Sequence, residues 1–165
     1  MLELNRISAG YGKQTVLDGI SVDFEKGKLT SIIGVNGCGK STLLKAILGI
    51  LSLSNGEIFI DGENLLTISR NEIAKKIAYL SQGKNIPDMT VEQMVLHGRF
   101  PYLSYPRRYS SHDREVAIKA METVGVAEFA HKPLYSLSGG MRQNAYIAMA
   151  LAQDTDYILL DEPTT

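Results

Sequence analysis

The sequence predicts an α/β fold in which a core of strands and helices carries an inserted helical subdomain. In the first third of the 165-residue chain, apolar residues alternate with polar ones, which is the period-two pattern of half-buried strands. An apolar run at residues 29–33 then enters a glycine-rich loop that is followed by a helical segment. Over residues 90–135 the apolar residues follow a helical period instead.

Two alternating runs predict the first strands, and a third strand is expected at residues 29–33, directly before the glycine loop. The alternating positions are Leu2, Leu4 and Ile7 in the first run and Ile20, Val22 and Phe24 in the second. Residues 42–48 have helical character and stop at Gly49. This order predicts a strand, loop and helix unit behind the N-terminal strands.

The rest of the chain alternates between further strands and helices. Residues 57–61, 77–80 and 157–160 are short apolar runs of strand length. Capping boxes are predicted where Ser69 precedes Glu72 and where Thr90 precedes Gln93. A last helix is expected to start near Ser138 and to run to residue 152.

Composition excludes several classes of protein. The single cysteine allows neither an intrachain disulfide nor a zinc cluster, so a reducing compartment is expected. A net charge of -1 gives no general nucleic-acid signal. The N-terminus does not follow a signal-peptide pattern, and no apolar run approaches the roughly 20 residues of a membrane helix, so any membrane role is expected to come through a partner.

Residues 34–41 match the phosphate-binding loop pattern G-x-x-x-x-G-K-[ST] in its strand-to-helix context. The loop residues are Gly34, Val35, Asn36, Gly37, Cys38, Gly39, Lys40 and Ser41. Glycines let backbone N–H groups converge on phosphates, Lys40 would reach the β- and γ-phosphates, and the Ser41 hydroxyl would ligate Mg²⁺. The alternative is a chance glycine turn.

Two carboxylates follow the last apolar strand. Asp161 and Glu162 stand where a nucleotide enzyme can hold one carboxylate near Mg²⁺ and direct the second at water. Alone, such a pair is usually a solvated strand end. With the phosphate loop upstream, we expect Asp161 to orient the metal and Glu162 to polarise the nucleophile.

A second helix start also has the features of an anion site. Ser138 precedes Gly139 and Gly140 at the start of the last predicted helix, so its hydroxyl and the following N–H groups could bind an anion. A plain N-cap or turn is the alternative. Two such helix ends in one domain of this size suggest that the second serves a nucleotide held by another copy.

With these motifs in this order, the sequence resembles the nucleotide-binding domain of ABC transporters over essentially its whole length. Tyr11 matches the aromatic that stacks on adenine, residues 34–41 match the Walker A loop with Thr42 following it, and Gln82 matches the glutamine that contacts Mg²⁺ and the membrane subunit. Ser138, Gly139 and Gly140 match the signature motif, which contacts the ATP of the opposing protomer. Residues 157–162 match Walker B, with Glu162 as the catalytic glutamate. Taken singly, Tyr11 could be a core tyrosine and Gln82 a polar strand end.

One further motif resembles a subgroup of that family. Residues 96–102, with residues 111–113 downstream, resemble the helical region of importers for ferric siderophores, haem and cobalamin. The alternative is a loop without subgroup meaning. Met141, Asn144 and Met149 depart from the family pattern, which puts the strength of the signature contact in doubt. The family's D-loop, its switch histidine and the strand between its Walker strands are expected beyond Thr165.

The resemblance implies an ABC-type P-loop NTPase fold with N-terminal antiparallel strands, an inserted helical subdomain and the C-terminal part of the core sheet missing. Residues 1–165 would form one incomplete ABC ATP-binding domain, with residues 1–89 and 137–165 as the ATP-binding core and residues 90–136 as the helical subdomain. This chain alone is expected to be inactive.

The resemblance also implies function and partners. The full-length protein would bind ATP and Mg²⁺, form a head-to-tail dimer with a second ATP-binding subunit and drive membrane-spanning permease subunits. A periplasmic or lipid-anchored substrate-binding protein would act indirectly, and no nucleic acid is expected. The location would be cytoplasmic, peripheral on the inner face of the cell membrane. The alternatives are a soluble ABC ATPase acting on nucleic acid or ribosomes, and a non-catalytic ATP-binding fragment.

Overall fold

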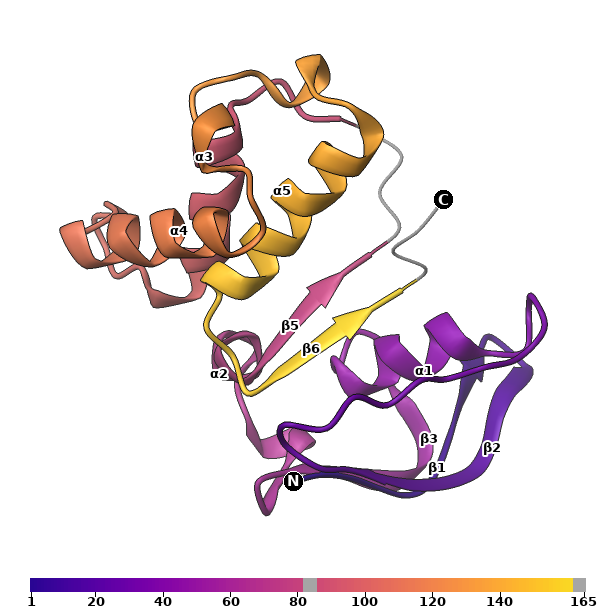
Figure 1. Cartoon of the computed structure of the whole chain (residues 1–165). Coiled ribbons are helices and arrows are strands. Elements are labelled where there is room, and N and C mark those ends of the chain that lie inside the picture. Colours follow the sequence, from indigo (N-terminus) through magenta and orange to yellow (C-terminus); the bar gives the residue numbers. More distant parts are fainter. Residues whose placement is uncertain (82–85, 162–165) are drawn as a thin grey trace. The chain divides into compact units, whose positions relative to one another are not determined.

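The computed structural model describes residues 1–81 and 86–161, which form two compact units (Figure 1). The first unit is Met1–Ile73 and the second is Ala74–Thr165. Of the residues predicted to carry chemistry, Gln82 and Glu162 lie outside the described residues.

An antiparallel sheet forms the first unit. Its strands are β1 (Leu2–Tyr11), β2 (Gln14–Phe24), β3 (Leu53–Ile60) and β4 (Glu63–Asn64), in the order β2-β1-β3-β4. Both N-terminal strands were predicted from their alternating pattern, and this prediction is confirmed.

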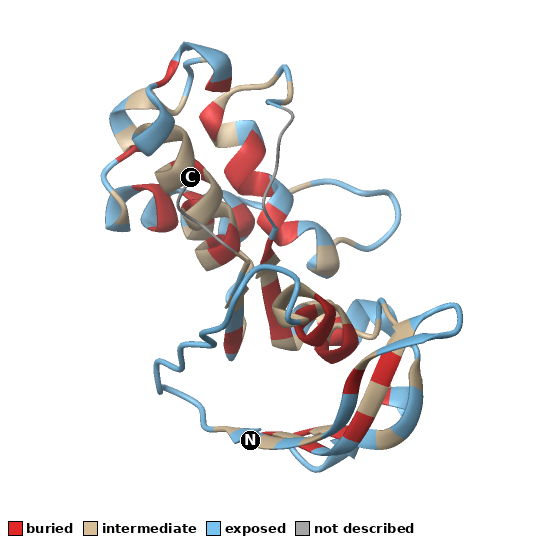
Figure 2. Cartoon of the chain, turned by 90° about the vertical axis from the view of Figure 1, so that its right-hand side faces the viewer, coloured by how far each residue is buried: buried red, intermediate tan, exposed pale blue. Residues whose placement is uncertain are grey.

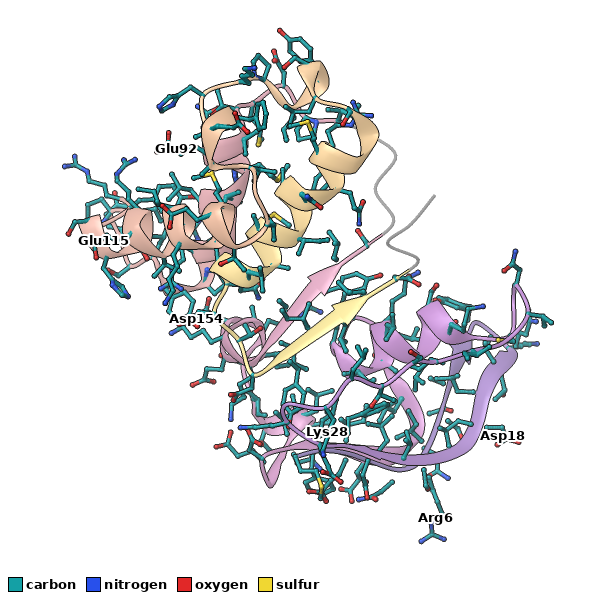
Figure 3. The ribbon with its side chains drawn as sticks, viewed as in Figure 1. Arg6, Asp18, Lys28, Glu92, Glu115 and Asp154 are labelled. Carbon is teal, nitrogen blue, oxygen red and sulfur yellow. The ribbon has the colours of Figure 1, made fainter. Side chains whose placement is uncertain are left out.

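The residues of β1 that point into the core switch from even-numbered to odd-numbered positions part-way along the strand. Leu2 and Leu4 are buried opposite Ile60 and Ile58 of β3, but the next buried residue is Ile7, not residue 6. A register shift lies between Leu4 and Ile7, and Arg6 has a φ of 45° there. The extra residue turns the Arg6 side chain away from the sheet (Figure 3), so that Ile7 points into the core.

Helix α1 (Lys40–Ile47) packs on β1 and β2, and it begins two residues before the predicted helix at residues 42–48. The 3-10 turn η1 (Leu65–Thr67) and helix α2 (Arg70–Lys76) follow β4, and α2 continues past the end of this unit. Buried residues gather between the sheet and α1 (Figure 2). The largest fully buried side chains among them are Leu2, Leu4, Ile7, Ile47, Ile58 and Ile60.

The prediction of a strand at residues 29–33 is wrong for this structure. These residues have no assigned strand, and Leu29 and Ile33 are 96% and 92% exposed. A strand exists only where another backbone pairs with its N–H and C=O groups, and none of the described strands pairs with this segment. The whole stretch 25–38, between β2 and the start of α1, is exposed.

The second unit combines a pair of parallel strands with a group of helices. Strands β5 (Ile77–Leu80) and β6 (Tyr157–Leu160) pair from Ile77 opposite Tyr157 to Leu80 opposite Leu160. Both match their predicted ranges. The helices are α3 (Val91–Leu96), α4 (Ser111–Thr123) and α5 (Gly139–Ala152), joined by the 3-10 turns η2 (His97–Tyr102), η3 (Ala127–Phe129) and η4 (Leu134–Ser136).

Capping residues set the starts of these helices. The predicted capping box of Thr90 and Gln93 starts α3, and the predicted pair of Ser69 and Glu72 forms hydrogen bonds at the start of α2. A further box of Ser110 and Asp113 starts α4. One apolar cluster then joins α3, α4 and α5, and its fully buried members include Val91, Val95, Val126, Leu134, Ala145 and Ala148. In the described part of the chain, no helix is long and apolar enough to cross a membrane.

The register shift between Leu4 and Ile7 of β1 is a β-bulge, and Gly56 of β3 lies against it. Gly62 has the same φ of 81° as Gly56 but different surroundings, so the two glycines give a testable prediction. A Cβ on Gly56 would overlap the Arg6 carbonyl oxygen, whereas a Cβ on Gly62 would meet nothing within 4 Å. We expect Gly62→Ala to cost about 1–2 kcal/mol for the left-handed backbone alone, and Gly56→Ala to cost clearly more. Urea unfolding midpoints measure both. Equal losses would contradict the close approach of β1 and β3 at this point.

Candidate glycine-loop site and signature helix

The glycine loop of the first unit wraps around a lysine. Lys40 is the first residue of α1, and its Nζ donates to the carbonyl oxygens of Gly34 at 2.9 Å and Val35 at 3.1 Å. The Cys38 N–H donates to the Val35 carbonyl at 3.3 Å, which closes the loop on itself. The predicted phosphate-loop lysine is therefore held against the loop that precedes it.

Glycine is required at two points of this loop. Gly39, the N-cap of α1, has a φ of 100°, and a Cβ there would lie 3.1 Å from Cγ1 of Val16. At Gly34 a Cβ would lie 2.6 Å from Sγ of Cys38. At Gly39 the left-handed φ disfavours any other residue, and a side chain at Gly34 would displace the Cys38 thiol, so both positions favour glycine.

The start of α1 offers a favourable place for an anion. The first N–H groups of a helix have no partner within the helix, and the helix dipole is positive at this end. The first turn of α1 has no acidic residue, and Lys40 adds a positive charge. Of the next two predicted residues, Ser41 is half-buried and Thr42 is buried. This arrangement can bind phosphate groups.

Tyr11 lies at the end of β1 with 49% of its surface exposed, so it is not a core tyrosine. The Nζ of Lys45, on α1, lies 6.0 Å from the centre of its ring. An exposed aromatic ring in the same unit as the glycine loop is free to stack on a flat ligand.

The second predicted anion site lies at the start of α5, in the second unit. The Ser138 hydroxyl accepts from the Met141 N–H at 3.3 Å, which caps the helix. Gly139 and Gly140 are exposed, and a Cβ at either would meet nothing within 4 Å. Packing within the chain therefore does not require glycine at these positions, although glycine weakens a helix by about 1 kcal/mol relative to alanine.

Asp161 directly follows β6 and is tied to β5. Its N–H donates to the Leu80 carbonyl at 3.0 Å, and its Oδ2 accepts from the Tyr79 hydroxyl at 3.2 Å. The sequence did not point to Tyr79. The only feature that could have indicated Tyr79 is its place on β5, the strand that pairs with β6 just before Asp161.

Residues 17–165 match the family described as ABC transporter. The chain belongs to the ABC transporter family. This match covers the glycine loop, the start of α5 and Asp161.

Among the relatives of this ABC chain is the petrobactin import ATP-binding protein FpuD of Bacillus anthracis, 43% identical over 99% of the chain and 60% of its own length. The ferric enterobactin transport ATP-binding protein FepC of Escherichia coli (strain K12) is 42% identical over 97% of the chain and 58% of its own length. The chain thus spans about 60% of the length of these relatives.

A solved ATP-binding cassette of an ABC transporter, in its ADP conformation, superimposes with a TM-score of 0.87 at 27% identity. The match covers 100% of this ABC chain and 69% of the cassette. The fold is therefore that of an ABC ATPase domain with antiparallel N-terminal strands, as predicted, and such domains bind nucleotide.

The exposed thiol of Cys38 allows a chemical test of nucleotide binding at the loop. This thiol lies beside the backbone of Gly34, inside the loop that encloses Lys40. We expect alkylation of Cys38 to block nucleotide binding, and bound Mg-ATP to slow the alkylation several-fold, because both occupants need the same space. Labelling rates followed by mass spectrometry measure this effect, with a Cys38→Ser chain as the unlabelled control. Identical rates with and without Mg-ATP would place the nucleotide elsewhere.

Proposed function

We propose that the chain is the ATP-binding part of the motor subunit of an ABC importer, which hydrolyses ATP to move an iron-siderophore complex, haem or cobalamin. The single observation that carries the proposal is the glycine loop closed around Lys40 in a chain of this family. The cargo class is supported by the printed functions of FpuD and FepC, which concern petrobactin and ferric enterobactin.

Nucleotide binding is assigned to the first unit. In this proposal Tyr11 stacks on adenine, the loop N–H groups of residues 34–41 and Thr42 hold the phosphates, and Lys40 exchanges its two carbonyl partners for phosphate oxygens. The exposed Tyr11 ring and the glycine backbone support these roles.

Magnesium and catalysis are assigned to oxygen-bearing residues. Ser41, Gln82 and Asp161 would hold Mg²⁺, which would neutralise phosphate charge when bound. Glu162 would act as the base that polarises the attacking water. The Tyr79 hydroxyl supports the assignment of Asp161, because it orients that carboxylate.

The start of α5 is assigned to a nucleotide held by another copy of the chain in a head-to-tail dimer. Gly139 and Gly140 leave the backbone N–H groups open, with no internal packing reason to be glycine. A ligand that approaches the backbone closely would supply that reason. Met141, where the family usually has glutamine, would not add a side-chain hydrogen bond to this contact.

Partners and location follow from the importer role. The proposed division is an ATP-binding core of residues 1–89 and 137–165 and a helical subdomain of residues 90–136. Membrane-spanning permease subunits would bind the motor on the cytoplasmic, inner face of the membrane. A periplasmic or lipid-anchored substrate-binding protein would act through the permease.

A second candidate concerns the 165-residue chain by itself, which we propose binds nucleotide without sustained turnover. The exposed Leu29 and Ile33 favour it, because the segment that enters the glycine loop lacks a pairing strand in the described structure. Such a loop can still bind phosphates, but a displacement of reacting groups by about 1 Å can slow turnover about 100-fold.

The role of Lys40 predicts a loss of affinity. Lys40→Ala removes the charge that faces the β- and γ-phosphates, so ATP binding should weaken by about 2 kcal/mol, or roughly 30-fold. Isothermal titration calorimetry measures this change. Lys119→Ala, on the exposed surface of α4, removes the same charge elsewhere and should leave affinity unchanged. Equal affinities in both variants would refute the assignment of the phosphate loop.

The role of Glu162 predicts a different pattern. In the full-length protein, Glu162→Gln keeps the shape of the side chain but removes the base, so turnover should fall at least about 100-fold while ATP binding persists. Phosphate release gives the rate, and size-exclusion chromatography with ATP should show a trapped dimer. A variant that turns over at the parental rate would assign the base to another residue.

A further inference from the structure

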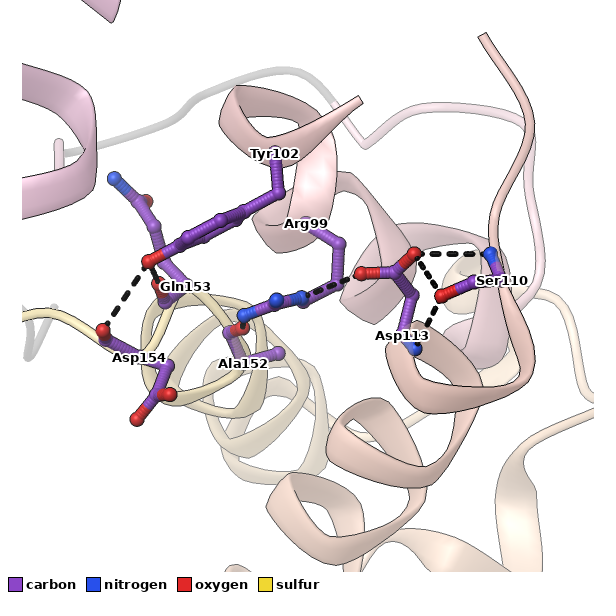
Figure 4. A network of polar contacts seen from close by, with 7 residues as sticks. All are labelled: Arg99, Tyr102, Ser110, Asp113, Ala152, Gln153 and Asp154. Carbon is purple, nitrogen blue, oxygen red and sulfur yellow. Dashed lines mark hydrogen bonds and ion pairs between the residues drawn. The ribbon is translucent and has the colours of Figure 1, made fainter. Parts of the chain in front are cut away.

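A charged network in the second unit joins α4, η2 and the end of α5 (Figure 4). We call it the Arg99 network, and it consists of Arg99, Tyr102, Ser110, Asp113, Ala152, Gln153 and Asp154. All of these residues belong to one unit. The sequence singled out residues 96–102 and 111–113 only as a resemblance to a subgroup of importers, and the proposed function uses none of them.

Arg99 forms a buried ion pair at the centre of this network. Its side chain is 5% exposed, and its Nε donates to Oδ1 of Asp113, which is 9% exposed, at 3.0 Å. The other oxygen of Asp113 accepts from the Ser110 N–H at 2.9 Å and hydroxyl at 2.7 Å. Burial alone would raise the pKa of Asp113, but these hydrogen bonds and the Arg99 charge lower it to about 2. The carboxylate thus stays charged near neutral pH.

The other side of the guanidinium holds the end of α5. Arg99 Nη1 donates to the carbonyl of Ala152, the last residue of that helix, at 3.0 Å. The last carbonyls of a helix have no partner within it, and a cation is favoured there. At Gly98 a Cβ would overlap the Met149 carbonyl, so η2 lies directly against the backbone of α5.

Tyr102 extends the contact into the turn that leads to β6. Its ring lies 3.9 Å from the Arg99 guanidinium carbon, and its hydroxyl donates to the carbonyls of Gln153 at 2.9 Å and Asp154 at 3.3 Å. The Gln153 side chain in turn donates to the carbonyls of Ala74 and Ile77, just before and at the start of β5. One network therefore holds the end of α5, the start of β5 and the turn that precedes β6.

The elements held in this way lead to three proposed functional segments. Helix α5 begins after Ser138, β6 is followed by Asp161, and β5 is followed by the stretch that contains Gln82. A buried ion pair is weak evidence for stability, since well-packed apolar residues often serve as well. Its directional bonds do specify geometry, because a planar guanidinium bonds several groups in fixed directions.

We propose that Arg99, with Tyr102, is a positioning residue for ATP turnover, which fixes α5 and β6 against each other so that the signature start and Asp161 keep one geometry. The inference rests on the proposed function. Neither residue touches nucleotide in this scheme. They act through the backbone of Ala152, Gln153 and Asp154.

The test uses the full-length protein and two conservative variants. Arg99→Lys keeps the charge but cannot bond Asp113 and Ala152 in the same fork. Tyr102→Phe keeps the ring and removes only the hydroxyl that holds residues 153 and 154. Tyr105→Phe is the matched control, because Tyr105 lies in the same segment and is 96% exposed. ATP affinity, kcat, KM and thermal melting are measured for the parent and each variant.

We expect kcat to fall about 3–10-fold in Tyr102→Phe and more than tenfold in Arg99→Lys, with ATP affinity within about twofold of the parent. These rates are read about 15 °C below the lowest melting temperature. The control should match the parent in all values. Should Arg99→Lys fail to fold, Tyr102→Phe decides the question alone.

The two proposals fail in different ways. A parent that binds no ATP or releases no phosphate would overturn the proposed function, and the inference with it. An active parent whose kcat is unchanged in Tyr102→Phe, and in Arg99→Lys where that variant folds, would overturn the inference alone, even if melting temperatures fall. A Tyr105→Phe loss equal to that of Tyr102→Phe would also overturn it.

Discussion

Close packing against α5 is the constraint on which the second unit depends. Its buried residues are all alanines, at positions 145, 148, 150 and 152, and its partly buried Met141, Tyr146, Met149 and Leu151 pack on the same apolar cluster. Helices α3 and α4, the turn η2 and strand β5 all contact it. Protein interiors tolerate few gaps, so elements packed this closely leave each other little freedom to shift. The direction of α5 is therefore set by several neighbours at once.

Local patterns in the sequence predicted most elements of the fold. Alternation over residues 2–7 and 20–24 predicted the first strands, and the Thr90 and Gln93 pair predicted the start of α3, because both signals lie within a few residues. The bulge at Arg6 was not predicted. It depends on the partner strand, where Gly56 approaches the Arg6 carbonyl.

The sequence predicted the residues of the candidate site itself, but it did not predict the residues that position them. The glycine loop and Ser138 follow recognisable spacings, whereas Tyr79 and Arg99 act through contacts 82 and 53 residues away in the chain. Charged residues such as Arg99 and Asp113 are usually exposed, so the sequence alone does not indicate that both are buried here. One local sign was available, since Asp113 stands three residues after Ser110 in a capping box, which turns its carboxylate back toward the helix start.

The exposed segment before the glycine loop has a consequence for solubility. Residues 29–35 include Leu29, Ile32, Ile33 and Val35, and none of the seven residues is charged or proline. An uncharged stretch rich in β-branched residues, which pairs with no strand among the described residues, is a template for strand pairing between molecules. A strand that paired with this segment would therefore do more than extend a sheet, because it would also protect the protein from aggregation at the entrance to its glycine loop.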